Sequence, residues 1–167
     1  HQHPRPHRLR SVLGLDAKNP AIVLPDADLG NAVGECLLGA LSFNGQRCTA
    51  LKILFVHAAV ADEFVARLAA AVDALPIGMP WDPGVWVTPL AEAGKPDYLR
   101  GLVDDALAKG AAVRNAAGGT VHDTYFHPAV LYPAAAGMRV WEEEQFGPVI
   151  PVVPFDAQAP EPGRVFG

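Results

Sequence analysis

Short apolar segments alternate with amphipathic stretches of ten or more residues along this chain, and this alternation limits its fold more than any other feature. An amphipathic stretch of that length can form a helix that returns the chain to the edge it left, so that successive strands run in one direction. The sequence therefore predicts the α/β class, with a parallel, Rossmann-like open sheet and flanking helices. The predicted strands are residues 21–24, 51–56, 112–113, 129–132 and 150–155.

The first helix is predicted with the clearest boundaries. Asp28 is a natural N-cap, and the apolar residues from Leu29 to Leu41 recur at the spacing of one helix face. Cys36 belongs to this apolar stripe. We therefore interpret Cys36 as a small buried core residue rather than as a reactive thiol.

Two further helices are predicted later in the chain. Apolar residues at helical spacing mark one helix over residues 60–75. A third helix is expected to begin with Asp97 as its cap and to end before Gly110. Residues 76–96, between the two, are rich in Pro, Gly and Trp without periodicity, so we expect a long loop there.

The chain is expected to hold one domain with an extension at each end. Its 167 residues and 17.6 kDa fit a single domain with a sizeable core. We assign residues 1–11 to a flexible N-terminal segment, residues 12–156 to the domain and residues 157–167 to a Pro-rich tail. Because the chain starts at His1 rather than Met and only twelve residues follow the last strand, we expect the sheet to be incomplete at both ends.

Charge and composition exclude several classes of protein. The 13 Lys and Arg against 18 Asp and Glu give a net charge of −5 without a basic stripe, so nucleic acid is not an expected partner. No apolar run approaches the length of a membrane span. Two cysteines outside any Cys-x-x-Cys spacing fit the cytoplasm and predict no metal site, and the His-containing N-terminus lacks fixed ligand geometry.

Cys48 differs from Cys36 because it lies at a predicted helix–strand junction among polar residues. Gly45 permits a close approach of the backbone, and Arg47 is a neighbouring cation. A thiolate is favoured where helix dipoles or cations offset its charge, so Cys48 is a candidate nucleophile. A cysteine at such a junction can also be a packing residue, and the residues alone leave both readings open.

The segment Phe-Asn-Gly-Gln-Arg-Cys-Thr-Ala at residues 43–50 resembles the active-site cysteine motif of the aldehyde dehydrogenase superfamily. Three more segments agree with that family in the same order: residues 18–29, 76–90 and 143–149. The resemblance covers about residues 12–156 and implies the catalytic domain of that family. With Lys52 following, the motif is most similar to the branch of NADP-dependent, non-phosphorylating glyceraldehyde-3-phosphate dehydrogenases.

The resemblance implies a reaction and its residues. Cys48 would attack an aldehyde, a hydride would pass to NADP or NAD, and water would release a carboxylic acid from the thioester. Arg47 would bind a substrate phosphate, for which a guanidinium offers a bidentate fork. Glu144 would bind the nicotinamide ribose hydroxyls and Phe146 would border the nicotinamide. Without the resemblance, Arg47 reads equally as a structural arginine and Glu144 as part of a solvated acidic run.

One departure from the family affects the base that activates water. Where the family has a Glu four residues before its conserved Lys, this chain has Gly14. Asp16 lies two residues further on, and in an extended segment both positions share a face, so Asp16 is a candidate substitute base. Its alternative role is that of a loop or capping aspartate.

The family's dinucleotide-binding region, its oxyanion Asn and its oligomerisation strand do not occur in these 167 residues. We therefore expect activity to belong to a longer parent protein and the isolated fragment to be inactive, because hydride transfer needs a nicotinamide held close to the reacting carbon. We expect that parent to be a homo-oligomer acting on a small aldehyde. Two alternatives stay open. One is a truncated, noncatalytic member acting as an interaction or assembly module; the other is a cysteine hydrolase, for which His57, His122 and His127 provide no motif that selects a partner.

Overall fold

The computed structural model describes residues 14–156, and the predictions for residues 1–11 and 157–167 lie outside the described residues. The strands are β1 (Pro20–Val23), β2 (Ile53–His57), β3 (Ala112–Val113), β4 (Val121–His122), β5 (Tyr125–Phe126), β6 (Ala129–Tyr132) and β7 (Val149–Phe155). The helices are α1 (Leu29–Leu41), α2 (Ala58–Asp73), α3 (Lys95–Ala108) and α4 (Arg139–Glu142), with a 3-10 helix, η2 (Ser42–Gly45).

The main sheet has the order β1-β2-β7-β6-β3. The pairs β1–β2, β2–β7 and β6–β7 are parallel, which confirms the predicted α/β class with a mostly parallel open sheet. The sheet is not parallel throughout, because β3 pairs antiparallel with β6. The sequence analysis also missed the short antiparallel hairpin of β4 and β5 and the single-turn helix α4.

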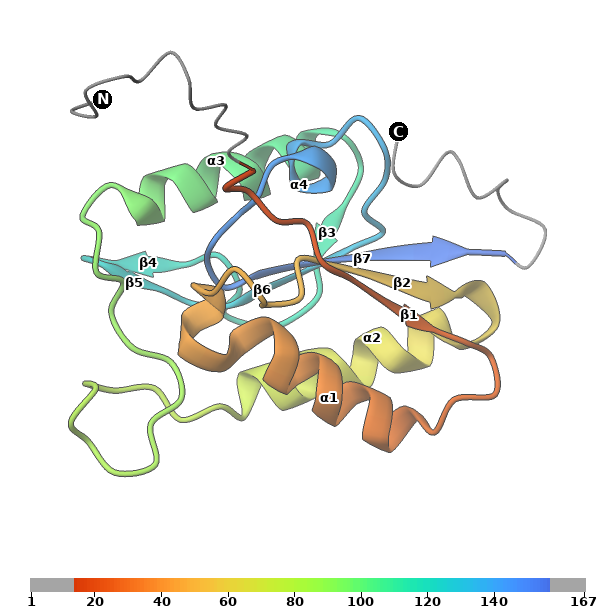
Figure 1. The fold of residues 1–167 in the computed structure, drawn as a ribbon, viewed down its shortest axis with the longest axis horizontal. Coiled ribbons are helices and arrows are strands. Elements are labelled where there is room, and N and C mark those ends of the chain that lie inside the picture. The colour runs from red at the N-terminus through yellow and green to blue at the C-terminus, as the bar shows by residue number, and fades with distance from the viewer. Residues whose placement is uncertain (1–13, 157–167) are drawn as a thin grey trace, which may run out of the picture.

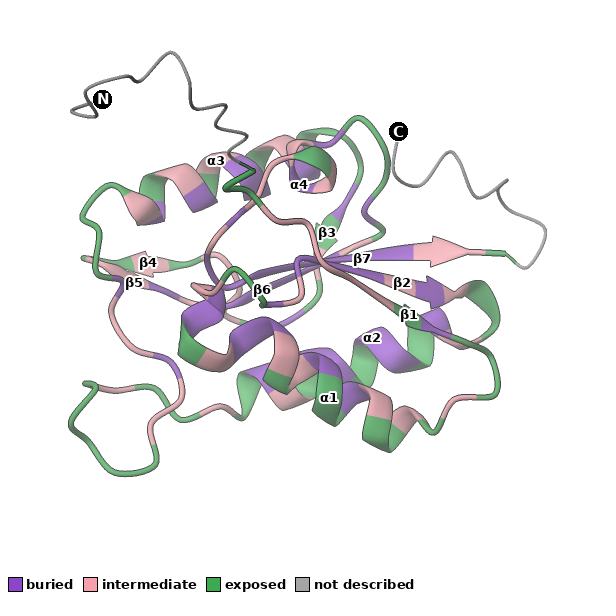
Figure 2. Cartoon of the chain, viewed as in Figure 1, coloured by how far each residue is buried: buried purple, intermediate pink, exposed green. Residues whose placement is uncertain are grey.

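Helices cover both faces of the sheet, as Figure 1 shows, with α1 and α2 on one face and α3 and α4 on the other. The strands alternate accordingly. Leu54 and Val56 of β2 pack into the core formed with α1 and α2, whereas Ile53 packs into the core formed with α3. Buried residues therefore line both faces of the central strands (Figure 2), as expected for a parallel sheet enclosed between helical layers.

The predicted start of the first helix is confirmed and that of the third is wrong. Asp28 caps α1, since its side chain accepts a hydrogen bond from the Asn31 N–H at 3.0 Å. Helix α3 instead begins at Lys95 after Gly94, and Asp97 lies inside its first turn. Proline is tolerated in a first turn, because its missing N–H removes no helical hydrogen bond there. The helix therefore includes Pro96 and begins before Asp97.

The first strand lies at an edge of the described sheet, whereas a short apolar run between prolines, such as residues 21–24, predicts a buried strand. β1 pairs only with β2 among the described strands, and Ile22 is 63% exposed. Leu24, predicted to end the strand, lies beyond β1 and is also exposed. An apolar run between prolines indicates a strand without showing how many neighbours it has, because pairing is decided by distant parts of the chain.

The parallel arrangement places three loop segments at the same edge of the sheet. Residues 14–19 lead into β1, residues 46–52 lead into β2, and residues 143–148 lead into β7. These strands are adjacent and parallel, so the segments that enter them meet at the edge formed by the strands' N-terminal ends. The predicted site residues lie in these three segments.

Candidate active site

The turn that carries Cys48, residues 43–50, is called the cysteine turn below, and it begins with an unusual stretch of backbone. Phe43, Asn44 and Gly45 all have left-handed conformations, with φ values of 54°, 56° and 68°. Asn44 is buried and paired at both ends of its amide: Nδ2 donates to the Thr88 carbonyl at 3.1 Å and to Thr88 Oγ1 at 2.9 Å, while Oδ1 accepts from the Thr88 N–H at 3.1 Å. These bonds hold the backbone in a conformation that asparagine tolerates better than most residues.

Gly45 brings the cysteine turn against the segment that precedes β7. A Cβ at this position would lie 2.6 Å from the Ala40 carbonyl oxygen and 2.9 Å from that of Gly147. Only glycine satisfies both the left-handed backbone and this close approach. The permissive role inferred for Gly45 therefore has a specific structural reason.

Cys48 is exposed, and its backbone is fixed by Asn19 from the segment before β1. Asn19 Nδ2 donates to the carbonyl of Cys48 at 2.6 Å and to that of Ala50 at 3.0 Å. The Asn19 carbonyl in turn accepts from the Lys52 N–H at 2.8 Å. Asn19 thus fixes where the cysteine turn lies relative to β1 and β2.

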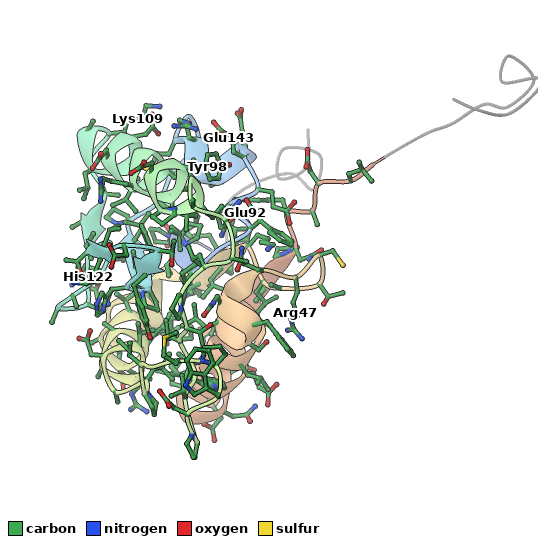
Figure 3. All side chains as sticks on the ribbon, turned by 90° about the vertical axis from the view of Figure 1, so that its left-hand side faces the viewer. Arg47, Glu92, Tyr98, Lys109, His122 and Glu143 are labelled. Carbon is green, nitrogen blue, oxygen red and sulfur yellow. The ribbon has the colours of Figure 1, made fainter. Side chains whose placement is uncertain are left out.

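Arg47 is partly buried and lies against Phe43, with its guanidinium carbon 5.6 Å from the ring centroid. Its Nε is buried and has no hydrogen-bond partner within residues 14–156. Figure 3 shows Arg47 well apart from Tyr98 and Glu143, which lie close together. Arg47 is therefore placed on the cysteine side of the site, with unused donor capacity.

Glu144 lies in the segment before β7, with its side chain only 10% exposed. Its Oε2 accepts from the Ala17 N–H at 3.2 Å. Its Oε1 lies 3.4 Å from Lys52 Nζ, an ion-pair contact without hydrogen-bond geometry, so this buried oxygen lacks a hydrogen-bond donor in the described part of the chain. A carboxylate of this kind fits a ligand that presents hydroxyl donors.

Phe146 has a left-handed backbone, with φ of 39°, and its ring faces two ammonium groups. Lys52 Nζ lies 5.0 Å from the ring centroid and Lys95 Nζ lies 5.5 Å from it. Both distances suit cation–π attraction. The structure thus brings Glu144 and Phe146 together with Lys52, which sequence reasoning used only to identify a branch of the family.

A buried polar network joins residues 143–149 to the segments before β1 and β2. Gln145 is fully buried; its Oε1 accepts from Lys18 Nζ at 2.8 Å, and its Nε2 donates to the carbonyls of Lys52 and Val149, both at 2.8 Å. Lys18 Nζ also donates to the Glu143 carbonyl at 2.7 Å. Burial, and then the nearby charge of Lys52, lowers the pKa of Lys18 to about 8 against the opposing effect of Glu144 and Glu143.

Asp16 is exposed and lines a pocket of about 490 Å³ on the side of the site that holds Glu144. The pocket is lined by Asp16, Ala17, Lys18, Tyr98, Glu142, Glu143 and Glu144, and Cys48 does not line it. Gly14 is also exposed, and a Cβ there would meet nothing within 4 Å. A longer side chain at position 14 therefore has room, and the role of Asp16 stays a prediction.

The site residues that sequence reasoning missed are Lys18, Lys52, Gln145 and Asn19. All four are polar residues in or next to recognised motifs, and for Lys52 the signal is a charged residue between Leu51 and Ile53 at a strand entrance. In residues 14–156, His, Cys, Asp and Glu do not gather in a group of three or more that could hold a metal ion. Over the same residues, no helix is long and apolar enough to cross a membrane.

Comparison with known proteins finds the same family over nearly the whole chain. The sequence model of the aldehyde dehydrogenase family matches residues 3–160. Vanillin dehydrogenase from Pseudomonas fluorescens is 42% identical over 147 residues, which are 88% of this chain and 30% of the relative. NADP-dependent glyceraldehyde-3-phosphate dehydrogenase from Streptococcus equinus is 37% identical over 85% of this chain and 29% of its own length. The chain thus spans about 30% of the length of these curated relatives.

Solved structures agree with the sequence comparison. The NADP complex of NADP-dependent glyceraldehyde-3-phosphate dehydrogenase from Bacillus halodurans C-125 is similar with a TM-score of 0.79 and 39% identity, covering 84% of this chain and 29% of that one. Salicylaldehyde dehydrogenase from Pseudomonas putida G7 is similar with a TM-score of 0.83 and 34% identity, covering 90% and 31%. The motifs, the fold and these likenesses agree, and the chain belongs to the aldehyde dehydrogenase family.

Proposed function

We propose that this chain supplies the nucleophile-bearing part of an aldehyde dehydrogenase that oxidises an aldehyde to a carboxylic acid with NADP or NAD. The observation that carries the proposal is the meeting of the exposed Cys48 turn with the Glu144–Phe146 segment through the contact between Gly45 and Gly147. These are the segments to which the family resemblance assigns the nucleophile and the cofactor contact. The relatives named above support the reaction class.

In the proposed reaction, Sγ of Cys48 forms a bond to the carbonyl carbon of the aldehyde, and the oxygen takes a proton to give a thiohemiacetal. A bound nicotinamide would supply the hydride acceptor for that carbon, and the hydroxyl proton would leave as the carbonyl of a thioester forms. Water then attacks the thioester; the carbon–sulfur bond breaks, the acid leaves and the thiol is restored. Each turnover would consume one aldehyde, one water and one oxidised nicotinamide cofactor, and would yield one carboxylic acid, one reduced cofactor and one proton.

The residues of this chain have distinct parts in that scheme. Glu144 Oε1, buried and without a hydrogen-bond donor in residues 14–156, would accept hydrogen bonds from the ribose hydroxyls, and the ring of Phe146 would border the nicotinamide. Arg47 would bind an anionic group on the substrate, since its buried Nε has no partner in the described residues. We therefore propose a phosphorylated aldehyde such as glyceraldehyde 3-phosphate as the substrate.

A chimeric enzyme tests the proposal. Residues 12–156 would replace the matching segment of the vanillin dehydrogenase of Pseudomonas fluorescens, and the formation of reduced cofactor would be followed with vanillin and with glyceraldehyde 3-phosphate. We expect aldehyde-dependent formation of reduced cofactor that Cys48→Ser abolishes and Cys36→Ser preserves. Arg47→Met should raise KM for the phosphorylated aldehyde about tenfold or more while leaving the KM for vanillin nearly unchanged.

The result that contradicts the proposal is equally definite. A folded chimera that fails to reduce cofactor with any aldehyde would favour the noncatalytic interaction module. Activity that survives Cys48→Ser would exclude Cys48 as the nucleophile.

The predicted cytoplasmic location and homo-oligomeric parent protein stay predictions.

A further inference from the structure

Lys52 is a charged residue in the interior that the proposed reaction does not use. Its side chain is 1% exposed, and it immediately precedes β2. Burying an ammonium group is costly unless it is paired and hydrogen-bonded. An apolar side chain would fill this position at a lower cost in desolvation free energy, so the contacts of the ammonium must offset that cost.

The contacts of Lys52 reach all three segments that form the site. Its Nζ donates to the carbonyl of Gly45 in the cysteine turn at 2.9 Å. The same Nζ lies 3.4 Å from Glu144 Oε1 and 5.0 Å from the centroid of the Phe146 ring. Its backbone N–H donates to the carbonyl of Asn19 at 2.8 Å, within the segment that leads into β1.

The geometry points to Lys52 as a positioning residue: we propose that its buried ammonium holds the Cys48 turn and the Glu144–Phe146 segment in register and supplies positive charge to both. This inference rests on the proposed roles of Cys48 and Glu144. In the proposed reaction Lys52 contacts neither the substrate nor the cofactor. It acts through the two segments that do.

The charges around Lys52 are compatible with this role. Burial lowers the pKa of the Lys52 ammonium, the charge of Glu144 and its hydrogen-bonding capacity raise it, Lys95 on α3 lowers it, and Cys48 raises it. Lys18, in the segment before β1, is a second cation in this environment. Glu144 is thus the carboxylate at ion-pair distance from Lys52, and the Gly45 carbonyl accepts a hydrogen bond from the same ammonium; removing the ammonium would leave both without it.

The test uses the 167-residue chain itself. The rate of alkylation of Cys48 by iodoacetamide would be measured against pH, together with hydrogen exchange of peptides covering residues 42–50 and 143–148. We expect Lys52→Met to raise the pH midpoint of Cys48 alkylation by about 0.5 to 1 unit, because the turn that carries Cys48 loses the cation that contacts its Gly45 carbonyl. The same variant should speed exchange in both peptides, and Lys52→Arg should restore the midpoint.

Lys109→Met is the matched control, since Lys109 caps the C-terminal end of α3 and pairs with Asp105. Figure 3 shows Lys109 well apart from Arg47 in the cysteine turn. It should change neither the midpoint nor the exchange of either peptide. A folded Lys52→Met chain with an unchanged midpoint would overturn the proposal. Faster exchange in only one of the two peptides would also overturn it, because a residue that joins two segments must affect both.

A second variant covers the case in which Lys52→Met does not fold. Glu144→Gln keeps Lys52 in place and removes the carboxylate that offsets its charge, so the midpoint of Cys48 alkylation should fall. A midpoint that stays constant or rises in Glu144→Gln would overturn the proposal. Alkylation requires neither aldehyde nor cofactor, so an inactive chimera would contradict the proposed function while leaving this test intact.

Discussion

The two cysteines of this chain lie twelve residues apart and have opposite environments. Cys36 lies on the apolar face of α1, is 4% exposed, and has its pKa raised to about 11 by burial and then by the charge of Glu35. Cys48 is exposed in a turn that Asn19 and Gly45 hold in place. The difference shows that the reactivity of a thiol depends on whether the fold places it in the core or in an exposed turn.

The same contrast holds for the two surroundings. Around Cys36 the side chains are apolar, and each fills space in a core. Beside the cysteine turn, buried polar side chains join segments far apart in the sequence, as Gln145 does with Lys18 and Lys52. Core positions of the first kind tolerate an apolar replacement of similar size, whereas each polar contact of the second kind leaves a partner unsatisfied when it is removed.

The largest expected effect concerns the base that the reactive region lacks at position 14. In the chimera, we expect a burst of reduced cofactor followed by slow turnover, because formation of the thioester needs no base at Gly14 and its hydrolysis does. Gly14→Glu should raise the steady rate by about 10²–10⁴-fold and leave the burst nearly unchanged. The open space around Gly14 accommodates the new side chain.

Asp16→Asn is the partner experiment for that prediction. If Asp16 is the substitute base, the chimera should turn over well and lose its steady rate on this substitution while keeping its burst. Stopped-flow measurement of both phases separates the two cases. Fast turnover that neither substitution changes would exclude both positions and direct the search to Glu142, Glu143 or a group outside the described residues.

The second prediction sharpens the comparison of the cysteines directly. At neutral pH, iodoacetamide should label Cys48 about 100-fold faster than Cys36, because Cys36 is buried and un-ionised. The rate for Cys36 should rise only as the pH approaches its pKa of about 11. Peptide mass analysis after timed quenching gives both rates in one sample.

Unfolding the chain in guanidinium provides the control, since both thiols are then solvated. The two rates should converge to within about threefold in the denatured chain, where neither thiol has a folded environment. Equal labelling in the folded chain would show that the turn gives Cys48 no advantage. That result would break the comparison.

The third and smallest expected effect compares a glycine of the cysteine turn with one of α1. Gly45→Ala should destabilise the chain by about 2–3 kcal/mol, because the left-handed backbone and the carbonyls of Ala40 and Gly147 leave no room for a Cβ. Gly34→Ala should stabilise it by about 0.5–1 kcal/mol, since a Cβ in that helix meets nothing within 4 Å. Urea unfolding followed by circular dichroism measures both.

These two substitutions add the same methyl group, so each is the control for the other. If Gly45→Ala had the same free energy of unfolding as the unsubstituted chain, the cysteine turn would not need its close contact with Gly147. A loss of stability in Gly34→Ala would mean that the exposed face of α1 packs against something within the folded chain.

The sequence determined the parts of this protein that depend on local spacing. The apolar residues of α1 recur at one helical face, so Cys36 was assigned to the core and its burial is confirmed. Collinear motifs identified the family, which the comparisons confirm. Local spacing does not decide a helix boundary where two start signals adjoin, as at Pro96 and Asp97, because either residue can mark the first turn.

Only the tertiary structure decided which polar residues meet. Lys18 and Gln145 are 127 residues apart, and Gln145 and Lys52 are 93 apart, yet the Gln145 amide bonds both the Lys18 ammonium and the Lys52 backbone carbonyl. No local spacing encodes such contacts, because they exist only once parallel pairing has brought the entrances of β1, β2 and β7 to one edge of the sheet. The buried ammonium of Lys52 is stabilised there because the fold brings Glu144, from a segment distant in the sequence, within ion-pair distance of it.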